Sequence, residues 1–291
     1  AETDIAGNVF IMGYFYSPSI TFGTYTLTNL GSGNIFIAQY DASGNVLWAK
    51  SGAGTGVDEG RGVTTDALGN SYITGDFNSP SITFGTYTVT NTGVLDVFLA
   101  KYNPAGNVLW AKSAQGANAD WGNSITTDGL GNIYVTGRYN SPTIVFGSYT
   151  LTNTGTTNTF LTKYDSSGTV LWSKNVGIGN NNFGNHVTTD ASGNIYVTGG
   201  FLSSFIIGTY NFVSAGNNDV FTAKFNSSGN VLWAKSAQGI GSDFGYSVAT
   251  DNNYNVYVAG RYSYTSVNSI SLGSITLPFP SGGTDPMFII K

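Results

Sequence analysis

The chain has 291 residues, with 11 Lys and Arg against 16 Asp and Glu, and it contains no cysteine. The net charge of −5 argues against a nucleic-acid or anionic-membrane surface, and the lack of cysteine excludes disulfides and thiolate metal sites. With 40 Gly, 41% hydrophobic residues and many aromatic side chains, the composition favours an all-β protein that has many turns and a sizeable core.

The second quarter of the chain predicts four short strands, which we name a to d in chain order. Strand a is expected in residues 63–66, strand b in 71–75, strand c in 97–102 and strand d in 108–113. Gly and Asn in the a–b and c–d connections are typical of tight turns that need a positive φ. The four strands therefore predict one antiparallel meander.

This pattern recurs five times, in copies that start near residues 1, 63, 125, 187 and 248. The clearest motif, Asn-x-aromatic-x-x-Gly, begins at Asn8, Asn70, Asn132, Asn194 and Asn255. A regular period of this size indicates supersecondary units that stack or are arranged radially. We predict one domain over residues 1–291, a five-bladed β-propeller of four-stranded antiparallel blades, because ring closure protects the sheet edges.

The stretch between strands b and c also repeats. Residues 17–29, 79–91 and 141–153 share Ser-Pro-(Ser/Thr)-Ile-x-Phe-Gly-x-Tyr-Thr-x-Thr-Asn. The fourth copy of this stretch is modified (203–213) and the fifth is longer (263–283). These stretches are too apolar for unstructured loops, so we expect each to add a short strand or hairpin to its blade.

The run from Asp96 to Lys112 and the word Asp-x-x-Gly-Asn-x-Tyr-Val-Thr-Gly resemble the SBBP-type family of bacterial β-propeller repeats. The resemblance extends over essentially the whole chain. It implies an extracellular or cell-surface bacterial protein, in a setting such as adhesion, and some family members carry a sorting domain for type IX secretion that is not recognised in this sequence. It implies no shared reaction or ligand.

The fifth copy is shorter than the others. Lys291 matches Lys101, so equivalents of residues 102–124, which hold the c–d turn, strand d and the d–a loop, are missing. We expect a fifth blade without its outer strand and an open strand-c edge at Met287, Phe288, Ile289 and Ile290. Either the full protein is longer, or a partner chain or neighbouring copy donates the strand. Because the chain begins at Ala1, we expect a processed protein or a fragment.

The b–c and d–a connections vary between copies, whereas the a–b and c–d turns hardly vary. Variable loops on a rigid scaffold often carry binding sites, so we place ligand binding on the b–c/d–a face. The candidates after strand b are Tyr14, Asp76, Arg138 and Arg261, and those of the d–a loop are Asp120, Trp121, Asp243 and Phe244.

Two interpretations stay open for the aromatic and cationic candidates. Trp121 either offers a platform to a glycan or peptide or packs its loop onto the neighbouring one. Arg138 and Arg261 either bind an anionic ligand or pair with a nearby carboxylate.

The acidic candidates have a similar ambiguity. Asp58, Asp120 and Asp243 occupy one equivalent position and form either a carboxylate ring at the channel mouth or hydrogen bonds to loop backbone. Asn182 at the fourth position favours hydrogen bonding, which Asn performs equally well.

Catalytic motifs are not found: the chain has no nucleophile elbow, phosphate loop, His-Glu zinc pair or dinucleotide fingerprint. His186, the only histidine, is interpreted as a surface substitution, and the Asp41 turn holds too few carboxylates for calcium. We predict a non-catalytic module, with no metal, cofactor, nucleic acid or membrane insertion, that binds a glycan or surface protein. The alternative is a glycoside hydrolase that uses the acidic mouth residues with Glu59.

Overall fold

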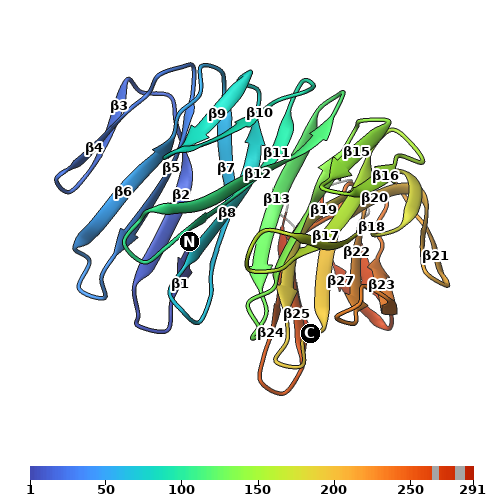
Figure 1. Cartoon of the computed structure of the whole chain (residues 1–291). Helices are drawn as coiled ribbons and strands as arrows, with labels where there is room; N and C mark the ends of the chain where they lie inside the picture. Colours follow the sequence, from blue (N-terminus) through green and yellow to red (C-terminus); the bar gives the residue numbers. More distant parts are fainter. Residues whose placement is uncertain (264–268, 279–285) are drawn as a thin grey trace. The chain divides into compact units, whose positions relative to one another are not determined.

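The computed structural model describes residues 1–263, 269–278 and 286–291, and the regular elements in these ranges are all β-strands (Figure 1). The described ranges contain no helix that is long and apolar enough to cross a bilayer. The chain divides into two compact units. The first comprises residues 1–135, 139–152 and 162–173, and the second comprises residues 136–138, 153–161 and 174–291. The boundary runs through the third copy.

The first two copies form antiparallel meanders in the predicted order a to d. The first sheet has the order β1 (Glu2–Thr3), β2 (Val9–Phe15), β5 (Asn34–Tyr40), β6 (Val46–Gly52). The second has β7 (Asp58–Thr65), β8 (Ser71–Phe77), β11 (Asp96–Tyr102), β12 (Val108–Gly116). In the second copy, the predicted strands b, c and d agree with the structure to within a few residues at their ends.

The later copies repeat this strand order. The third sheet has β13 (Asp120–Thr127), β14 (Ile133–Tyr139), β17 (Asn158–Tyr164) and β18 (Val170–Asn175). The fourth has β19 (Ile178–Thr189), β20 (Ile195–Ile207), β22 (Asp219–Phe225) and β23 (Val231–Ala237). In the described residues the fifth has three strands, β24 (Phe244–Thr250), β25 (Val256–Arg261) and β28 (Met287–Ile290).

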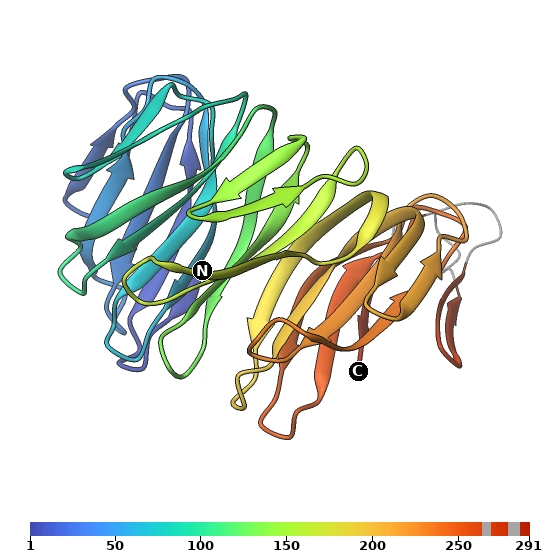
Figure 2. The same ribbon diagram turned by 45° about the vertical axis from the view of Figure 1, so that its right-hand side comes forward.

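The stretches between strands b and c form the predicted hairpins, visible in Figures 1 and 2. They are β3 (Ser19–Phe22) with β4 (Tyr25–Thr28), β9 (Ser81–Phe84) with β10 (Tyr87–Thr90), β15 (Thr143–Phe146) with β16 (Tyr149–Thr152), β21 (Tyr210–Val213) with the end of β20, and β26 (Ser269–Leu272) with β27 (Ile275–Pro278). Of the predicted fifth stretch, residues 264–268 and 279–283 lie outside the described residues.

The hairpins do not simply extend their own blades. β15 of the third copy pairs with the end of β12 of the second copy, where Gln115 faces Val145. The bridges between Ala53 and Thr83 and between Gln238 and Ser271 make the same connection elsewhere. Each of these three hairpins therefore ties its own copy to the preceding one.

Strand a is longer than the sequence suggested. β7 begins at Asp58, not at Val63, and its pairing with β8 shifts register between Gly60 and Gly62. Such a shift is typical of a β-bulge, in which the chain absorbs an extra residue and pairing then continues. Asp58 and Glu59, which precede the predicted start of strand a, consequently lie in a strand.

The a–b turn explains the Asn that begins the most regular motif of the repeat, Asn-x-aromatic-x-x-Gly. Asp66 Oδ1 accepts the backbone N–H groups of Leu68 and Asn70, at 2.9 Å each. Asp66 Oδ2 accepts Asn70 Nδ2 and the Tyr72 hydroxyl, at 2.8 Å each. Gly69 has a φ of 76°, in the left-handed region that suits glycine. The same bonds surround Asp128, Asp190 and Asp251.

The hydrophobic core lies between neighbouring sheets. In the first unit, Phe10 and Trp48 of the first copy share a buried cluster with Phe98 and Tyr102 of the second. In the second unit, a second cluster joins the fourth and fifth copies. Full burial of one such aromatic side chain contributes about 1.5–3 kcal/mol, so packing between neighbouring sheets stabilises each repeat.

Candidate functional site

In the second and fifth copies, the end of strand b pairs with the start of strand a. Glu59 faces Asp76 in the second copy, and Phe244 faces Arg261 in the fifth. Within each unit, we call the surface formed by the ends of strand b and the starts of strand a the loop face of that unit. Its variable positions lie on bulged strands with fixed register, so their side chains have defined neighbours.

In the first unit the loop face carries a polar cluster centred on Arg61. Arg61 Nε donates to Asp76 Oδ1, and Arg61 Nη2 donates to Glu59 Oε2 at 2.6 Å. The Tyr16 hydroxyl contacts Glu59 Oε1 at 3.3 Å, and Tyr14 packs edge-on against Tyr16, with ring centroids 5.5 Å apart. Asp76 is thus neutralised by an arginine, whereas Tyr14 and Tyr16 remain exposed.

In the second unit the loop face carries an aromatic cluster instead. Phe244 stacks parallel to Tyr246, with centroids 6.1 Å apart, and packs against Phe183 at 5.9 Å. The Arg261 guanidinium lies over the Phe244 ring at 5.1 Å and over the Tyr246 ring at 6.0 Å. Cation–π contacts of this kind help to hold an arginine in place. Tyr246 is 48% exposed.

The acidic candidates are enclosed. Asp120 has no exposed surface and accepts hydrogen bonds from Asn140 N, Ser141 N and Ser141 Oγ, at 3.0, 3.1 and 2.7 Å. Burial raises the pKa of Asp120 to about 6. Asp58 bonds Ser79 in the same way, and Asp243, 1% exposed, accepts from Ser263 N. This geometry favours the hydrogen-bonding interpretation over a carboxylate ring, and it gives no support to glycoside hydrolysis.

The remaining candidates are half-buried. Trp121 and Arg138 both lie between buried and exposed, on β13 and β14. His186 is also half-buried, not a surface substitution as expected: its Nδ1 accepts the N–H of Val248 at 3.4 Å, and burial lowers its pKa. The histidine packs against the neighbouring strand a because β19 and β24 lie side by side.

Sequence comparison missed Arg61 and Tyr246. Arg61 and Tyr246 occupy one position of strand a, where the third and fourth copies have Asn123 and Asn185. The sequence does show that this position varies, because the second to fifth copies have Arg, Asn, Asn and Tyr there. It was overlooked because strand a was expected to begin after it.

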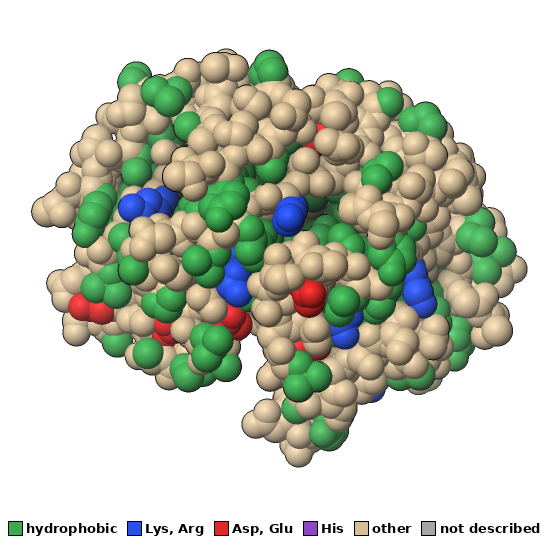
Figure 3. Space-filling model, in the orientation of Figure 1, with side chains coloured by type: hydrophobic (Ala, Val, Ile, Leu, Met, Phe, Trp, Pro, Cys, Tyr) green, Lys and Arg blue, Asp and Glu red, His purple; other side chains and the backbone are tan. Residues whose placement is uncertain are grey.

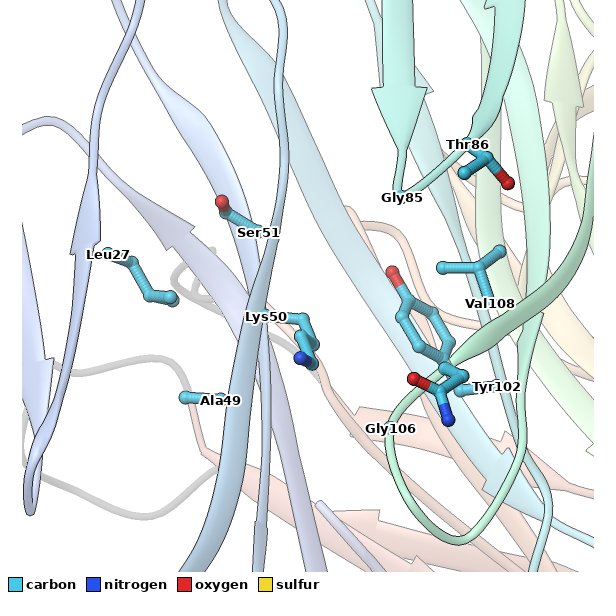
Figure 4. Close-up of a pocket in the computed structure, with 10 residues that line it drawn as sticks. Leu27, Ala49, Lys50, Ser51, Gly85, Thr86, Tyr102, Gly106 and Val108 are labelled. Atoms are coloured by element: carbon cyan, nitrogen blue, oxygen red, sulfur yellow. The ribbon is translucent and has the colours of Figure 1, made fainter.

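A groove also recurs where neighbouring copies meet. In the first unit, one groove of about 400 Å³ lies between strand d of the first copy and the hairpin and c–d turn of the second (Figure 4). In Figure 4, Tyr102 stands between Lys50 and Val108, beneath the turn of Gly85 and Thr86. A second groove of about 300 Å³ repeats this arrangement between the second and third copies.

Charged side chains are sparse on the face shown in Figure 3, where hydrophobic side chains are scattered among neutral polar surface.

The oxygens of the Asp41 turn accept N–H groups of the turn itself, from Ser43 and Asn45. Within the described ranges, no group of three or more His, Cys, Asp or Glu is arranged to hold a metal ion.

Comparison with known proteins agrees with the repeat. Residues 110–141 match the family model described as "SBBP: Beta-propeller repeat". An uncharacterized WD repeat-containing protein, L264, of Acanthamoeba polyphaga mimivirus is 26% identical over 333 aligned residues, which include 91% of this chain. The chain spans only 24% of the length of that relative. These matches and the observed sheets support the β-propeller repeat as the building unit of this chain.

Proposed function

We propose that the chain is a β-propeller binding module that recognises a partner protein through its loop face, and that its five copies are the five blades of one propeller. The observation that carries the proposal is the cluster of Arg261, Phe244 and Tyr246. Arginine and tyrosine are enriched among the residues that dominate protein–protein binding energy. Rigid aromatic rings also lose little conformational entropy on binding.

The polar cluster of the first unit would add specificity. Arg61 already has carboxylate partners, so a ligand carboxylate would have to compete with Glu59 and Asp76. Tyr14 and Tyr16 are exposed beside it and present both an aromatic face and a hydroxyl. A neutral or aromatic partner surface therefore suits this cluster better than a strongly anionic one.

The alternative ligand class is a glycan, for which exposed tyrosines also offer stacking surfaces. We favour a protein because the Arg261 guanidinium lies over the Phe244 and Tyr246 rings, and arginine and tyrosine are enriched among the residues that dominate protein–protein binding energy. The non-catalytic role and the bacterial, secreted or cell-surface setting stay predictions.

A displayed peptide library, with a glycan array run in parallel, tests the proposal. We expect selected peptides to lose at least about tenfold in affinity for the Tyr246→Ala/Arg261→Ala variant, because about 1.4 kcal/mol accompanies each tenfold change. Tyr254→Ala is the matched control, since Tyr254 is similarly exposed (52%) but lies in an a–b turn. Glycan binding without peptide binding, or equal losses in both variants, would contradict the proposal.

A further inference from the structure

The two grooves of the first unit each contain a tyrosine hydroxyl that has no partner among the described residues. Tyr102 lines the first groove and Tyr164 lines the second, and the two residues are only 1% and 5% exposed. Neither hydroxyl forms a hydrogen bond with a described residue. In Figure 4 the Tyr102 hydroxyl points from its ring toward the hairpin turn at Gly85. A buried hydroxyl without a partner costs free energy, so we expect a bound molecule to supply one.

A lysine lines each of these grooves as well. Lys50 and Lys112 are exposed, and neither forms a hydrogen bond or an ion pair with a described residue. No described Asp or Glu lines either groove, although the chain has 16 acidic residues against 11 Lys and Arg. Each ammonium group is therefore free to pair with an anionic group of a ligand.

Short polar side chains surround the lysine and the tyrosine. They occupy equivalent positions in the two grooves, Ser51, Thr86 and Asn107 in the first and Ser113, Ser148 and Thr169 in the second. Val108 and Val170 add an apolar wall. A few polar groups beside an apolar surface fix the orientation of a small ligand. One cation among several hydroxyl groups suits a hydroxylated ligand that carries one negative charge.

The groove between the third and fourth copies lacks both features. It has a volume of about 520 Å³, and Phe225 occupies the position of the tyrosine. Lys174, the equivalent lysine, donates to the carbonyls of Ser228 and Gly229, at 2.9 and 3.0 Å, and to Asn230 Oδ1 at 3.3 Å. The turns of the first two grooves have equivalent carbonyls, but their lysines do not use them. The lysine is thus left unpaired only in the two grooves that also have the tyrosine hydroxyl.

Both ends of the first groove are closed against an added β-strand. At one end Ala53 and Thr83 exchange backbone hydrogen bonds of 2.9 and 3.0 Å. At the other end the Tyr25 hydroxyl donates to the Leu47 carbonyl at 2.7 Å. Residues 49–51 of strand d lie between these contacts, an edge that is shorter than a typical strand. A compact ring therefore fits this space better than an extended peptide.

The two grooves present the same groups in consecutive copies of one compact unit. A ligand that repeats one chemical unit can occupy both grooves at once, and the second attachment raises the affinity without a new kind of contact. A folded protein would need two identical surface features at matching positions. A linear polymer carries such features along its whole length.

We propose that these two grooves bind acidic sugar units of a linear polysaccharide, of the uronic acid class. The carboxylate of each sugar accepts a hydrogen bond from Lys50 or Lys112, and a sugar hydroxyl bonds the hydroxyl of Tyr102 or Tyr164. The short polar side chains bond the remaining sugar hydroxyls. These grooves are separate from the loop face, and the proposal does not depend on a partner protein binding there.

Titration calorimetry of the 291-residue chain with polygalacturonate and with alginate tests this proposal. We expect at least one polyuronate to bind, and the neutral methyl ester of that polymer to bind at least about tenfold more weakly. Lys50→Gln/Lys112→Gln should lose about tenfold or more in affinity. Lys174→Gln is the matched control, because it makes the same change in the groove that has no tyrosine, and it should leave the affinity unchanged.

A second variant, Tyr102→Phe/Tyr164→Phe, separates binding from folding. It should weaken binding by about fivefold or more without lowering the Tm, because the hydroxyls that it removes bond no described residue. The proposal is overturned if neither polyuronate binds, if acid and ester bind equally, or if the double lysine variant binds like the unaltered chain. Binding of poly-L-glutamate without binding of a polyuronate would also overturn it, by assigning the grooves to an acidic peptide.

Discussion

Tyr254 holds a φ of 62° at a turn position where the other four copies have glycine. A left-handed backbone costs a non-glycine residue on the order of 1–3 kcal/mol, and the Tyr254 side chain is half exposed. Its hydroxyl makes one long contact of 3.3 Å with Ser192 Oγ. The residue therefore gains little from its ring to offset the backbone strain.

We expect Tyr254→Gly to raise the free energy of unfolding by about 1 kcal/mol, less the entropy that glycine gains in the unfolded chain. Urea unfolding followed by tryptophan fluorescence measures this. Gly193→Ala is the matched control in the preceding copy, since a Cβ there meets no atom within 4 Å and only the backbone, at a φ of 75°, is strained. Equal stability of Tyr254→Gly and the unaltered chain would contradict the assignment of strain.

Within the a–b turn, the copies differ in one hydrogen bond. Asp128 accepts from Leu130 N, from Asn132 twice and from the buried hydroxyl of Tyr134. Asp4 makes the equivalent bonds to Ala6 and Asn8, but the first copy has Phe10 where the others have tyrosine.

Asp128→Ala should therefore destabilise the chain by about 1–3 kcal/mol more than Asp4→Ala, because only the former leaves a buried hydroxyl without its acceptor. Adding Tyr134→Phe to Asp128→Ala should recover most of that difference. Chemical denaturation of the four chains measures it. If the two alanine variants lose equal stability, the tyrosine hydroxyl does not contribute as described.

At the scale of elements, the repeat predicted strands b, c and d and the hairpins well, because their residues also determine their local conformation. Glycine at positive φ and Asx residues at the turns act within a few residues. The true start of strand a was not predictable in this way, since the bulge after Gly60 depends on pairing with β8. The hairpin contact with the preceding copy escaped prediction for the same reason, as did the cluster around Arg261, which needs Phe244 and Tyr246 from another strand.

For the whole molecule, the buried carboxyl groups set the direction of the pH dependence. Burial raises the pKa of Asp120 to about 6 and also raises the pKa values of Asp58, Asp96 and Asp219. A raised carboxyl pKa means that the folded chain binds more protons than the unfolded chain between the unfolded value, about 3.9, and the folded one. Stability then falls as the pH rises through this window.

Two kinds of contribution oppose this trend: the lowered pKa of His186, and the lowered pKa values of Asp41, Asp66, Asp165, Asp190 and Asp251. Burial lowers the pKa of His186, so protonation of the unfolded chain costs stability below about pH 6.5. The Asn255 side-chain hydrogen bond leads the effects that lower the pKa of Asp251 to about 2, and that stability is lost only as the pH falls below about 4. Four raised carboxyls outnumber one histidine, so we expect the highest stability between about pH 4 and 6.

Calorimetric Tm values between pH 7.5 and 4.5 check this expectation. We expect Tm to rise as the pH falls from 7.5 to about 5, and to rise less in Asp120→Asn, whose amide can still accept from Ser141 N. The contribution of Asp120 to the unfolding free energy is on the order of 1–3 kcal/mol. Identical pH profiles for the two chains would show that Asp120 is not held as described.

The hairpins have a consequence for how such a gene can change in length. Each of three hairpins is encoded in one copy but hydrogen-bonded to the end of the last strand of the copy before it, or to the residue that directly follows that strand. Duplication of one complete period restores every such bond wherever the recombination breakpoints fall. Excision of a lone period as an independent piece leaves its hairpin without a neighbour to hold. The boundaries of one sequence period therefore differ from the boundaries of the strands that are hydrogen-bonded together. This difference favours growth of the gene by whole tandem periods over exchange of isolated ones.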